Sequence, residues 1–160
     1  MAFLARRASF VVGGFGVAAA ATLSSSDRAP RCHCQVPCGI FDDPLRMASL
    51  REDAATIRKA MVQIQALSED LKSAQTLNQA TRWVHTKETH CDNVIKTTAD
   101  YLLAQRVKPE LFASDKDYAE ALIAHHKLLV AAMKAKQTVD TAAVDALLAA
   151  IDHLDPMYRK

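Results

Sequence analysis

The chain has 160 residues, half of them hydrophobic, with only four glycines and five prolines. A chain of this length can bury one core, and the abundance of Ala, Leu, Lys and Glu favours helices over sheets. The formal net charge of +2 does not indicate a nucleic-acid surface, because four basic residues (Arg6, Arg7, Arg28, Arg31) precede His33. From His33 onward, 17 acidic residues outnumber 16 basic ones, so we expect no nucleic-acid partner.

Residues 1–32 have the composition of a removable targeting leader. Arg6 and Arg7 lie in a start without acidic residues, and the apolar stretch 10–23 precedes a polar run. Such a pattern is typical of leaders, and the stretch is short for a membrane span, which needs about 20 apolar residues. A membrane anchor is the alternative. We expect a mitochondrion or a plastid as the destination, although a secretory route fits the same features, and no stable membrane association after leader removal.

Three of the four cysteines lie within the segment Cys32–Cys38, which reads Cys-His-Cys-Gln-Val-Pro-Cys and is followed by glycine. Soft sulfur ligands, an imidazole and turn-forming residues make this a compact chelating sequence. A Cys34–Cys38 disulfide in a redox-active tail is one interpretation. A zinc site built from Cys32, His33, Cys34 and Cys38 is another, although zinc sites usually draw their ligands from two separated pairs.

Four helices are predicted after this segment, because apolar side chains recur at steps of three and four residues. They cover about residues 44–74, 78–105, 114 to beyond 133, and 141–154. The side chains expected to face the core of the first two helices are Leu50, Ala54, Ile57, Met61, Ile64, Leu67 and Leu71, then Trp83 or Val84, the Lys87 stem, Cys91, Val94, Ile95, Thr98, Tyr101 and Leu102. Those of the last two are Tyr118, Leu122, His125 or His126, Leu129 and Met133, then Val144, Leu147, Leu148, Ile151 and Leu154.

Helix start signals support these boundaries. An aspartate cap precedes Pro44 at the first helix, where proline is well tolerated. The third helix begins at a Ser-x-x-Asp sequence, Ser114 to Asp117, which is similar to a capping box. Short connections between amphipathic helices predict an antiparallel four-helix bundle.

The sequence from His33 to Phe41, His-Cys-Gln-Val-Pro-Cys-Gly-Ile-Phe, resembles the N-terminal hook of the nickel-containing superoxide dismutases, His-Cys-x-x-Pro-Cys-Gly-x-Tyr. That family places its hook directly ahead of a four-helix bundle of about this length. The resemblance implies an all-α fold with a removable leader over residues 1–32, a nickel hook over 33–43 and a bundle over 44–160. It departs from the family in having Gln35 in place of an acid, Phe41 in place of tyrosine, and one extra acid before Pro44.

The resemblance also implies the metal site. The catalytic and metal-binding residues would be His33, Cys34 and Cys38, which would hold one nickel ion per subunit through two thiolates, the Cys34 amide nitrogen, and the amine and imidazole of His33. The enzyme would disproportionate superoxide to oxygen and hydrogen peroxide by cycling of the bound nickel, as a homohexamer. Glu52, Arg82 and His90 are candidate partners of the His33 imidazole. The alternative function is a non-enzymatic helical module whose cysteines bind zinc or form a disulfide.

Leader removal would complete this site. While His33 follows Cys32 in the chain, its nitrogen is a planar, non-basic amide. A free N-terminal amine has a pKa of about 8 and a lone pair for a metal. A protease that cuts before His33 would therefore create a ligand. The remaining conspicuous side chains are expected to pack: Cys91 as a small buried residue, Trp83 in the core, and His125 or His126 in the core or at an interface.

Overall fold

The structure, a computed structural model, describes residues 43–159. Its elements in chain order are α1 (Asp43–Ser68), α2 (Ala74–Lys96), the π-helix η1 (Thr97–Arg106), the short 3₁₀ helix η2 (Pro109–Leu111), α3 (Asp115–Lys136) and α4 (Ala142–Tyr158). All the regular elements in this part of the chain are helices, so the all-α prediction is confirmed.

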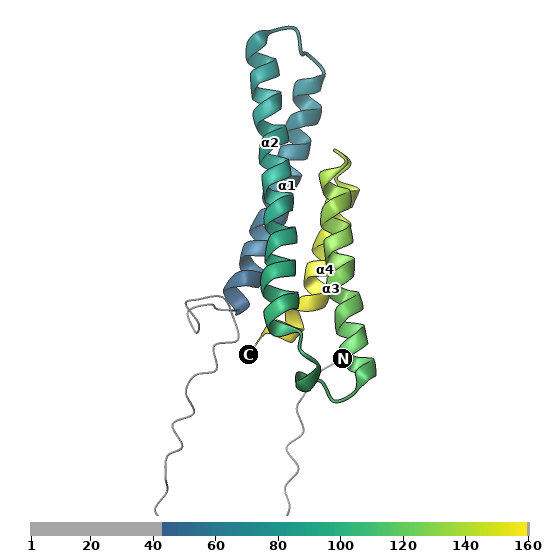
Figure 1. The fold of residues 1–160 in the computed structure, drawn as a ribbon. Coiled ribbons are helices and arrows are strands. Elements are labelled where there is room, and N and C mark those ends of the chain that lie inside the picture. The colour runs from purple at the N-terminus through teal and green to yellow at the C-terminus, as the bar shows by residue number, and fades with distance from the viewer. Residues whose placement is uncertain (1–42, 160) are drawn as a thin grey trace, which may run out of the picture.

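The four long helices lie side by side, each running opposite to the one before it (Figure 1). The start of α1, the end of η1 and the end of α4 share one end of the bundle, here called the hook end. At the opposite end the α1–α2 hairpin extends beyond α3 and α4 (Figure 1). Leu71, predicted to face the core, and Val84, predicted to do so as the alternative to Trp83, are exposed on this hairpin.

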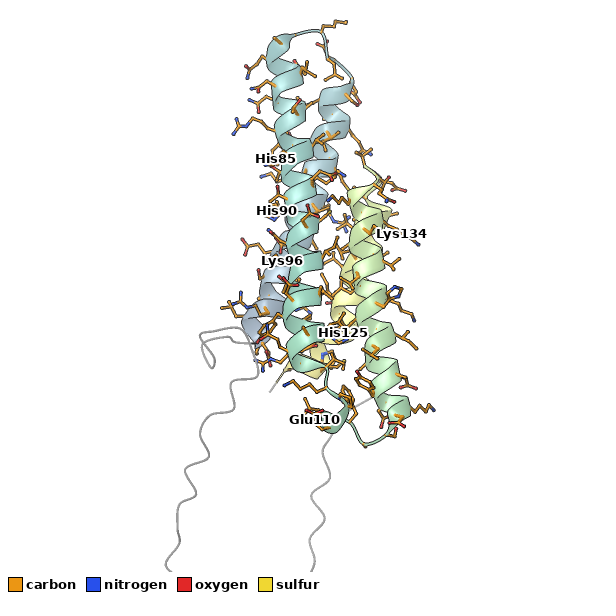
Figure 2. The ribbon with its side chains drawn as sticks, in the orientation of Figure 1. His85, His90, Lys96, Glu110, His125 and Lys134 are labelled. Atoms are coloured by element: carbon orange, nitrogen blue, oxygen red, sulfur yellow. The ribbon has the colours of Figure 1, made fainter. Side chains whose placement is uncertain are left out.

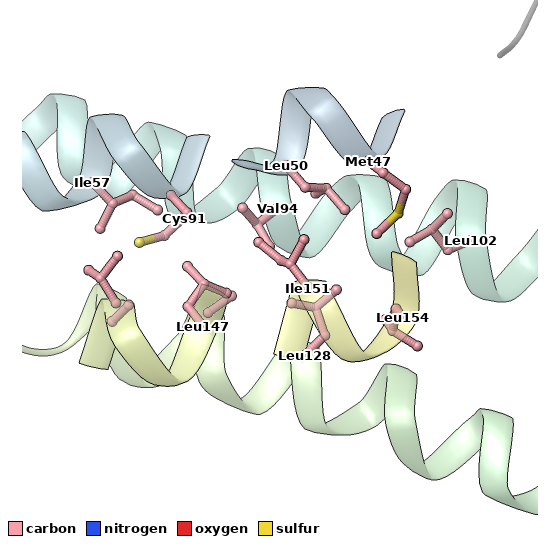
Figure 3. Packing of buried hydrophobic residues seen from close by; sticks show 14 of the residues in the cluster. Met47, Leu50, Ile57, Cys91, Val94, Leu102, Leu128, Leu147, Ile151 and Leu154 are labelled. Carbon is pink, nitrogen blue, oxygen red and sulfur yellow. The ribbon is translucent and has the colours of Figure 1, made fainter. Parts of the chain in front are cut away.

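One apolar core fills the space between the helices (Figure 3). Its fully buried side chains come from every long helix, including Leu50, Ile57, Val94, Leu128 and Ile151. Burying such a side chain contributes roughly 1.5–3 kcal/mol to folding. The predicted core faces of the first, second and fourth helices are largely confirmed by this packing.

The turn between the first two helices differs from the prediction. α1 ends at Ser68, six residues early, and α2 begins at Ala74, four residues early. Acidic Glu69 and Asp70 come next in the chain, where they would oppose the negative end of the α1 dipole. Ser73 then caps α2, because its hydroxyl accepts a hydrogen bond from the Thr76 amide at 3.0 Å.

The buried face of α3 was predicted wrongly in part. Leu122 and Met133 are 37% and 46% exposed, whereas the face against the core is formed mostly by small residues: Ala121, Ala124, His125, Leu128, Ala132 and Ala135. Alanines shorten the distance at which helices pack, so the larger side chains beside them turn outward. α4 also extends past its predicted end at Leu154 to Tyr158, with Pro156 in its last turn.

Candidate metal centre

The predicted nickel ligands His33, Cys34 and Cys38 lie outside the described residues. Their donor set, two thiolates with nitrogen ligands, suits divalent nickel. Between residues 43 and 159 no group of three or more His, Cys, Asp or Glu side chains is arranged to hold a metal ion. Cys38 precedes Asp43, the first residue of α1, by five residues. The described residues nearest in the chain to the predicted ligands are therefore those at the start of α1, at the hook end of the bundle.

Asp43, the first residue of α1, is held by two side chains of η1. Its Oδ1 accepts hydrogen bonds from Arg106 Nε at 2.8 Å and from the Tyr101 hydroxyl. Arg106 Nη2 also donates to the Tyr101 oxygen at 2.7 Å, which closes the triangle. We call these three residues the Asp43 cluster. Its side chains are largely withdrawn from water, with Tyr101 only 6% exposed, so these charge-assisted hydrogen bonds are stronger than they would be in solvent.

The burial of Tyr101 and its hydrogen bond to Asp43 determine whether its hydroxyl is protonated. Burial raises the pKa of Tyr101, and the hydrogen bond to the Asp43 carboxylate raises that pKa further. The hydroxyl therefore stays protonated at neutral pH and remains a donor to Asp43.

The π-helix brings Tyr101 and Arg106 onto one face. In an α-helix of 3.6 residues per turn, side chains five residues apart point about 140° away from each other. A π-helix is wider, because its hydrogen bonds join residues five apart, and Val107 N–H closes such a bond to the Leu102 carbonyl at 3.1 Å. The predicted second helix thus ends close to its expected position at Gln105, but its last ten residues form a π-helix that contributes Tyr101 and Arg106 to the Asp43 cluster.

A second buried pair lies at the hook end. His125 is fully buried, and its Nδ1 lies 2.8 Å from the Ala121 carbonyl, which can only accept (Figure 2). Nδ1 therefore carries the proton, and Nε2 accepts from the Tyr158 hydroxyl at 2.5 Å. Burial lowers the pKa of His125 and raises the pKa of Tyr158. The prediction of a packing role is confirmed for His125, while His126 faces outward.

The three candidate partners of the His33 imidazole are not equivalent. Glu52 and Arg82 are exposed, whereas His90 lies half-buried in the middle of α2 with its Nδ1 2.6 Å from Asp53 Oδ1 (Figure 2). Sequence reasoning missed Asp53. Its position, three residues after Leu50 and four before Ile57 on the buried stripe of α1, is the signal that could have found it, because a buried acid needs a partner.

A groove of about 300 Å³ on the surface of α1, α2 and η1 runs between the His90–Asp53 pair and the Asp43 cluster. Asp53 and Asn93 line it near His90, Tyr101 lines it at the Asp43 cluster, and Arg46 and Lys96 add positive charge to its wall. The groove is therefore a polar surface of mixed charge that reaches the hook end.

Two conspicuous side chains do not contribute to a site. Cys91 is a fully buried free thiol in the core, as predicted, and burial raises its pKa to about 11, so it is not a reactive thiolate. Trp83 is half-buried instead of belonging to the core, with Lys59 Nζ 6.0 Å from its ring centroid. Among the described helices none is long and apolar enough to span a bilayer.

Comparison with known proteins gives one match. The family model described as nickel-containing superoxide dismutase matches residues 28–160, which include the hook sequence and the whole bundle. No curated protein and no solved structure matches the chain. The family match excludes a non-enzymatic helical module, and it makes the chain an oxidoreductase that uses nickel and acts on superoxide. Because the match covers most of the sequence, and the four-helix fold and the hook sequence agree with it, this chain belongs to the nickel-containing superoxide dismutases.

Proposed function

We propose that the chain is a precursor that becomes a superoxide dismutase when a protease cuts before His33, and that His33, Cys34 and Cys38 then bind one nickel ion per subunit. The observation that carries this proposal is the sequence His33-Cys34-x-x-Pro37-Cys38-Gly39, which lies inside the region matched by the nickel family. Cys32 would leave with residues 1–32 and takes no part in the site.

Each donor has a chemical role. The Cys34 and Cys38 thiolates, the deprotonated Cys34 amide, and the amine and imidazole of His33 would hold the metal, a mixture of sulfur and nitrogen donors that suits divalent nickel. When bound, nickel supplies the one-electron couple through which one superoxide is oxidised to oxygen and a second is reduced to hydrogen peroxide.

The described residues would orient the imidazole. A metal-bound histidine usually donates its second ring N–H to a carboxylate or another acceptor. Of the three predicted candidates, all of them described residues, only the His90 side chain has a side-chain hydrogen-bond partner, Asp53, so we assign the His90–Asp53 pair to this orienting role.

The first prediction concerns the liberated amine. We expect the purified mature protein to begin at His33 and to contain about one nickel per subunit, as measured by intact mass and metal analysis. Adding one residue before His33 should abolish superoxide consumption, because the amine ligand becomes an amide. A matched control adds one residue at the C-terminus and should remain active.

Two outcomes would contradict the proposal. One is full activity of the chain extended by one residue before His33. The other is a mature protein that starts elsewhere and contains zinc in place of nickel, as expected of a cysteine-rich zinc segment.

The assembly and destination of the enzyme also belong to this proposal. We propose a homohexamer in which each hook packs against neighbouring subunits, since a short segment needs such support to hold its ligands in one geometry. Sedimentation analysis of the mature protein should give six times the subunit mass. We further propose that residues 1–32 direct the chain to a mitochondrion or a plastid, where the processed protein acts as an antioxidant enzyme. A fusion of residues 1–32 to a fluorescent reporter should then accumulate in that organelle.

A further inference from the structure

We propose that Tyr158 and His125 form a redox site, in which Tyr158 gives one electron to a small oxidising radical while its proton moves to His125 Nε2. One such radical is the carbonate radical anion, which forms where hydrogen peroxide and bicarbonate meet a redox-active metal. Superoxide then returns the electron to Tyr158. This inference goes beyond the proposed function, because it requires neither a nickel ion nor any of the proposed nickel ligands.

The first argument is the direction of the hydrogen bond between the two side chains. The Tyr158 hydroxyl donates to His125 Nε2 at 2.5 Å, because Nδ1 of the same ring carries the proton that is donated to the Ala121 carbonyl. Loss of an electron makes the proton of a phenol strongly acidic, so oxidation is easier when a base accepts that proton in the same step. His125 Nε2 is such a base, already at hydrogen-bond distance.

The second argument is the enclosure of the pair in the bundle. His125 is fully buried and Tyr158 is only 5% exposed, and their rings meet edge to face with centroids 5.8 Å apart. Packing alone does not require this pair, because two apolar side chains of similar shape would avoid the desolvation of polar groups. A phenol that has lost an electron is a far stronger acid than imidazolium, so Nε2 accepts the proton even though burial disfavours a charged ring.

A cavity gives small molecules access to the pair. It has a volume of about 250 Å³, and Tyr158 lines it together with Arg106 and Arg159. A water molecule takes up about 30 Å³ in the liquid, so a radical of a few atoms fits. The cavity therefore lets such a radical contact the Tyr158 side chain without opening the core.

The third argument is the contrast with the other two tyrosines of the chain, Tyr101 and Tyr118. Tyr101 donates to the Asp43 carboxylate, and a carboxylate is a weaker base than a neutral imidazole. Its oxygen also accepts a hydrogen bond from Arg106 Nη2 at 2.7 Å, and the positive charge of that group opposes the loss of an electron. Between residues 43 and 159 the Tyr118 hydroxyl has no hydrogen-bond partner. Tyr158 is therefore the tyrosine best suited to oxidation.

The two steps balance in electrons and protons. In the first, the carbonate radical anion takes one electron and becomes carbonate, the Tyr158 O–H bond breaks, and the proton bonds to His125 Nε2. This leaves a neutral phenoxyl radical beside an imidazolium. In the second, superoxide gives one electron to the phenoxyl radical and leaves as oxygen, while the proton returns from Nε2 to the phenolic oxygen. The protein ends unchanged, with one oxidising radical reduced and one superoxide oxidised.

The test uses the full-length chain without metal and with the substitutions Cys32→Ser, Cys34→Ser and Cys38→Ser, so that thiols of the hook sequence do not compete for the radical. Pulse radiolysis in azide solution supplies azide radicals as the one-electron oxidant, and the absorption band of the phenoxyl radical is recorded over time. Two variants of this chain are compared with it. Tyr158→Phe removes the proposed site, and Tyr101→Phe is the matched control, because it also removes one hydroxyl from a buried tyrosine, which is 6% exposed.

We expect the slowly decaying phenoxyl signal to be lost in Tyr158→Phe and retained in Tyr101→Phe. His125→Gln should form the signal more slowly, since the amide is a much weaker base than imidazole. Superoxide added after the pulse should shorten the lifetime of the signal and regenerate unmodified Tyr158, as measured by peptide mass.

Two outcomes overturn the redox site. One is an equal loss of signal in Tyr158→Phe and Tyr101→Phe, which would mean that the His125–Tyr158 pair only packs. The other does not depend on whether a variant folds: the electron paramagnetic resonance spectrum of the chain with an unmutated pair, frozen after oxidation, should lose the coupling of one exchangeable proton in D₂O, and an unchanged spectrum contradicts the transfer to Nε2.

Oxygen addition to the Tyr158 ring by superoxide would overturn the return step. Nickel binding by the chain that begins at His33 is a separate measurement, so the proposed function and this inference fail independently.

Discussion

His125 gives the bundle a titratable group with a defined environment. Its Nδ1–H is bonded to the Ala121 carbonyl and its Nε2 to the Tyr158 hydroxyl, so both ring nitrogens are satisfied in the neutral form. Burial removes the charged imidazolium from water, and this desolvation lowers the pKa of His125, while the hydrogen bond to the Ala121 carbonyl partly opposes the shift.

The second prediction follows from the sign of that shift. In the unfolded chain the histidine takes up a proton below about pH 6.5, whereas the folded protein resists protonation down to a lower pH. Unfolding is therefore coupled to proton uptake, and stability should fall as the pH decreases below about 6.5. Thermal unfolding of the uncut, nickel-free precursor between about pH 8 and pH 5 measures this.

Separate substitutions of two neighbouring histidines test whether His125 causes this pH dependence of stability. His125→Gln cannot titrate, so its melting temperature should depend less on pH over this range than that of the unmutated chain. His126→Gln, one residue along on the exposed face of α3, should retain the original dependence. Equal slopes for the His125→Gln and unmutated chains would show that His125 is not the titrating group.

The caps of α3 and α4 make the third prediction possible. Ser114 Oγ accepts a hydrogen bond from the Asp117 amide at 3.2 Å and donates to Asp117 Oδ2 at 2.9 Å. Ser114→Ala should therefore reduce the free energy of unfolding by about 1 kcal/mol. Thr141, the corresponding residue of α4, makes no such side-chain bond, and Thr141→Ala should cost less than about 0.5 kcal/mol. Urea unfolding of the uncut precursor compares them; similar losses would contradict this assignment of the caps.

Elements with local signals were predictable from the sequence. The Ser114 cap and the break before Pro109 depend on residues adjacent in the chain, and the structure confirms both. The hook could be identified for the same reason, since its three candidate ligands lie within six residues of each other.

Features that depend on distant partners could not be predicted. The side chains of the π-helix η1 contact Asp43, which precedes Tyr101 by 58 residues, and nothing in the sequence of the segment Thr97–Arg106 marks it as different from an α-helix. The outward position of Leu122 similarly depends on how closely α3 packs on its neighbours. The position of Asp53 on the buried stripe of α1 marks it as a buried acid, but its partner His90 lies on another helix and could not be identified from the sequence.

At the scale of the whole molecule, stability depends on the shared core. Leu128 is fully buried in α3, whereas Leu122 on the same helix is 37% exposed. Our fourth prediction is that Leu128→Ala lowers the free energy of unfolding by roughly 2–5 kcal/mol, while Leu122→Ala changes it by less than about 0.5 kcal/mol.

Measuring unfolding at several protein concentrations distinguishes an effect on the core of one bundle from an effect on a contact between subunits. A large, concentration-independent loss for Leu122→Ala would mean that the face assigned to α3 is wrong. A loss that varies with protein concentration would instead place Leu122 in a contact between subunits.

The position of the end of α4 has a practical consequence for purification. Arg159 and Tyr158 line the same small cavity as Arg106 of the Asp43 cluster, so residues appended to the C-terminus would emerge beside this cluster at the start of α1. A polyhistidine tag fused there would add many imidazoles that could compete with the proposed nickel ligands. If residues 1–32 are removed as proposed, a tag fused ahead of residue 1 would be lost with them, so we recommend an affinity label without metal-binding side chains.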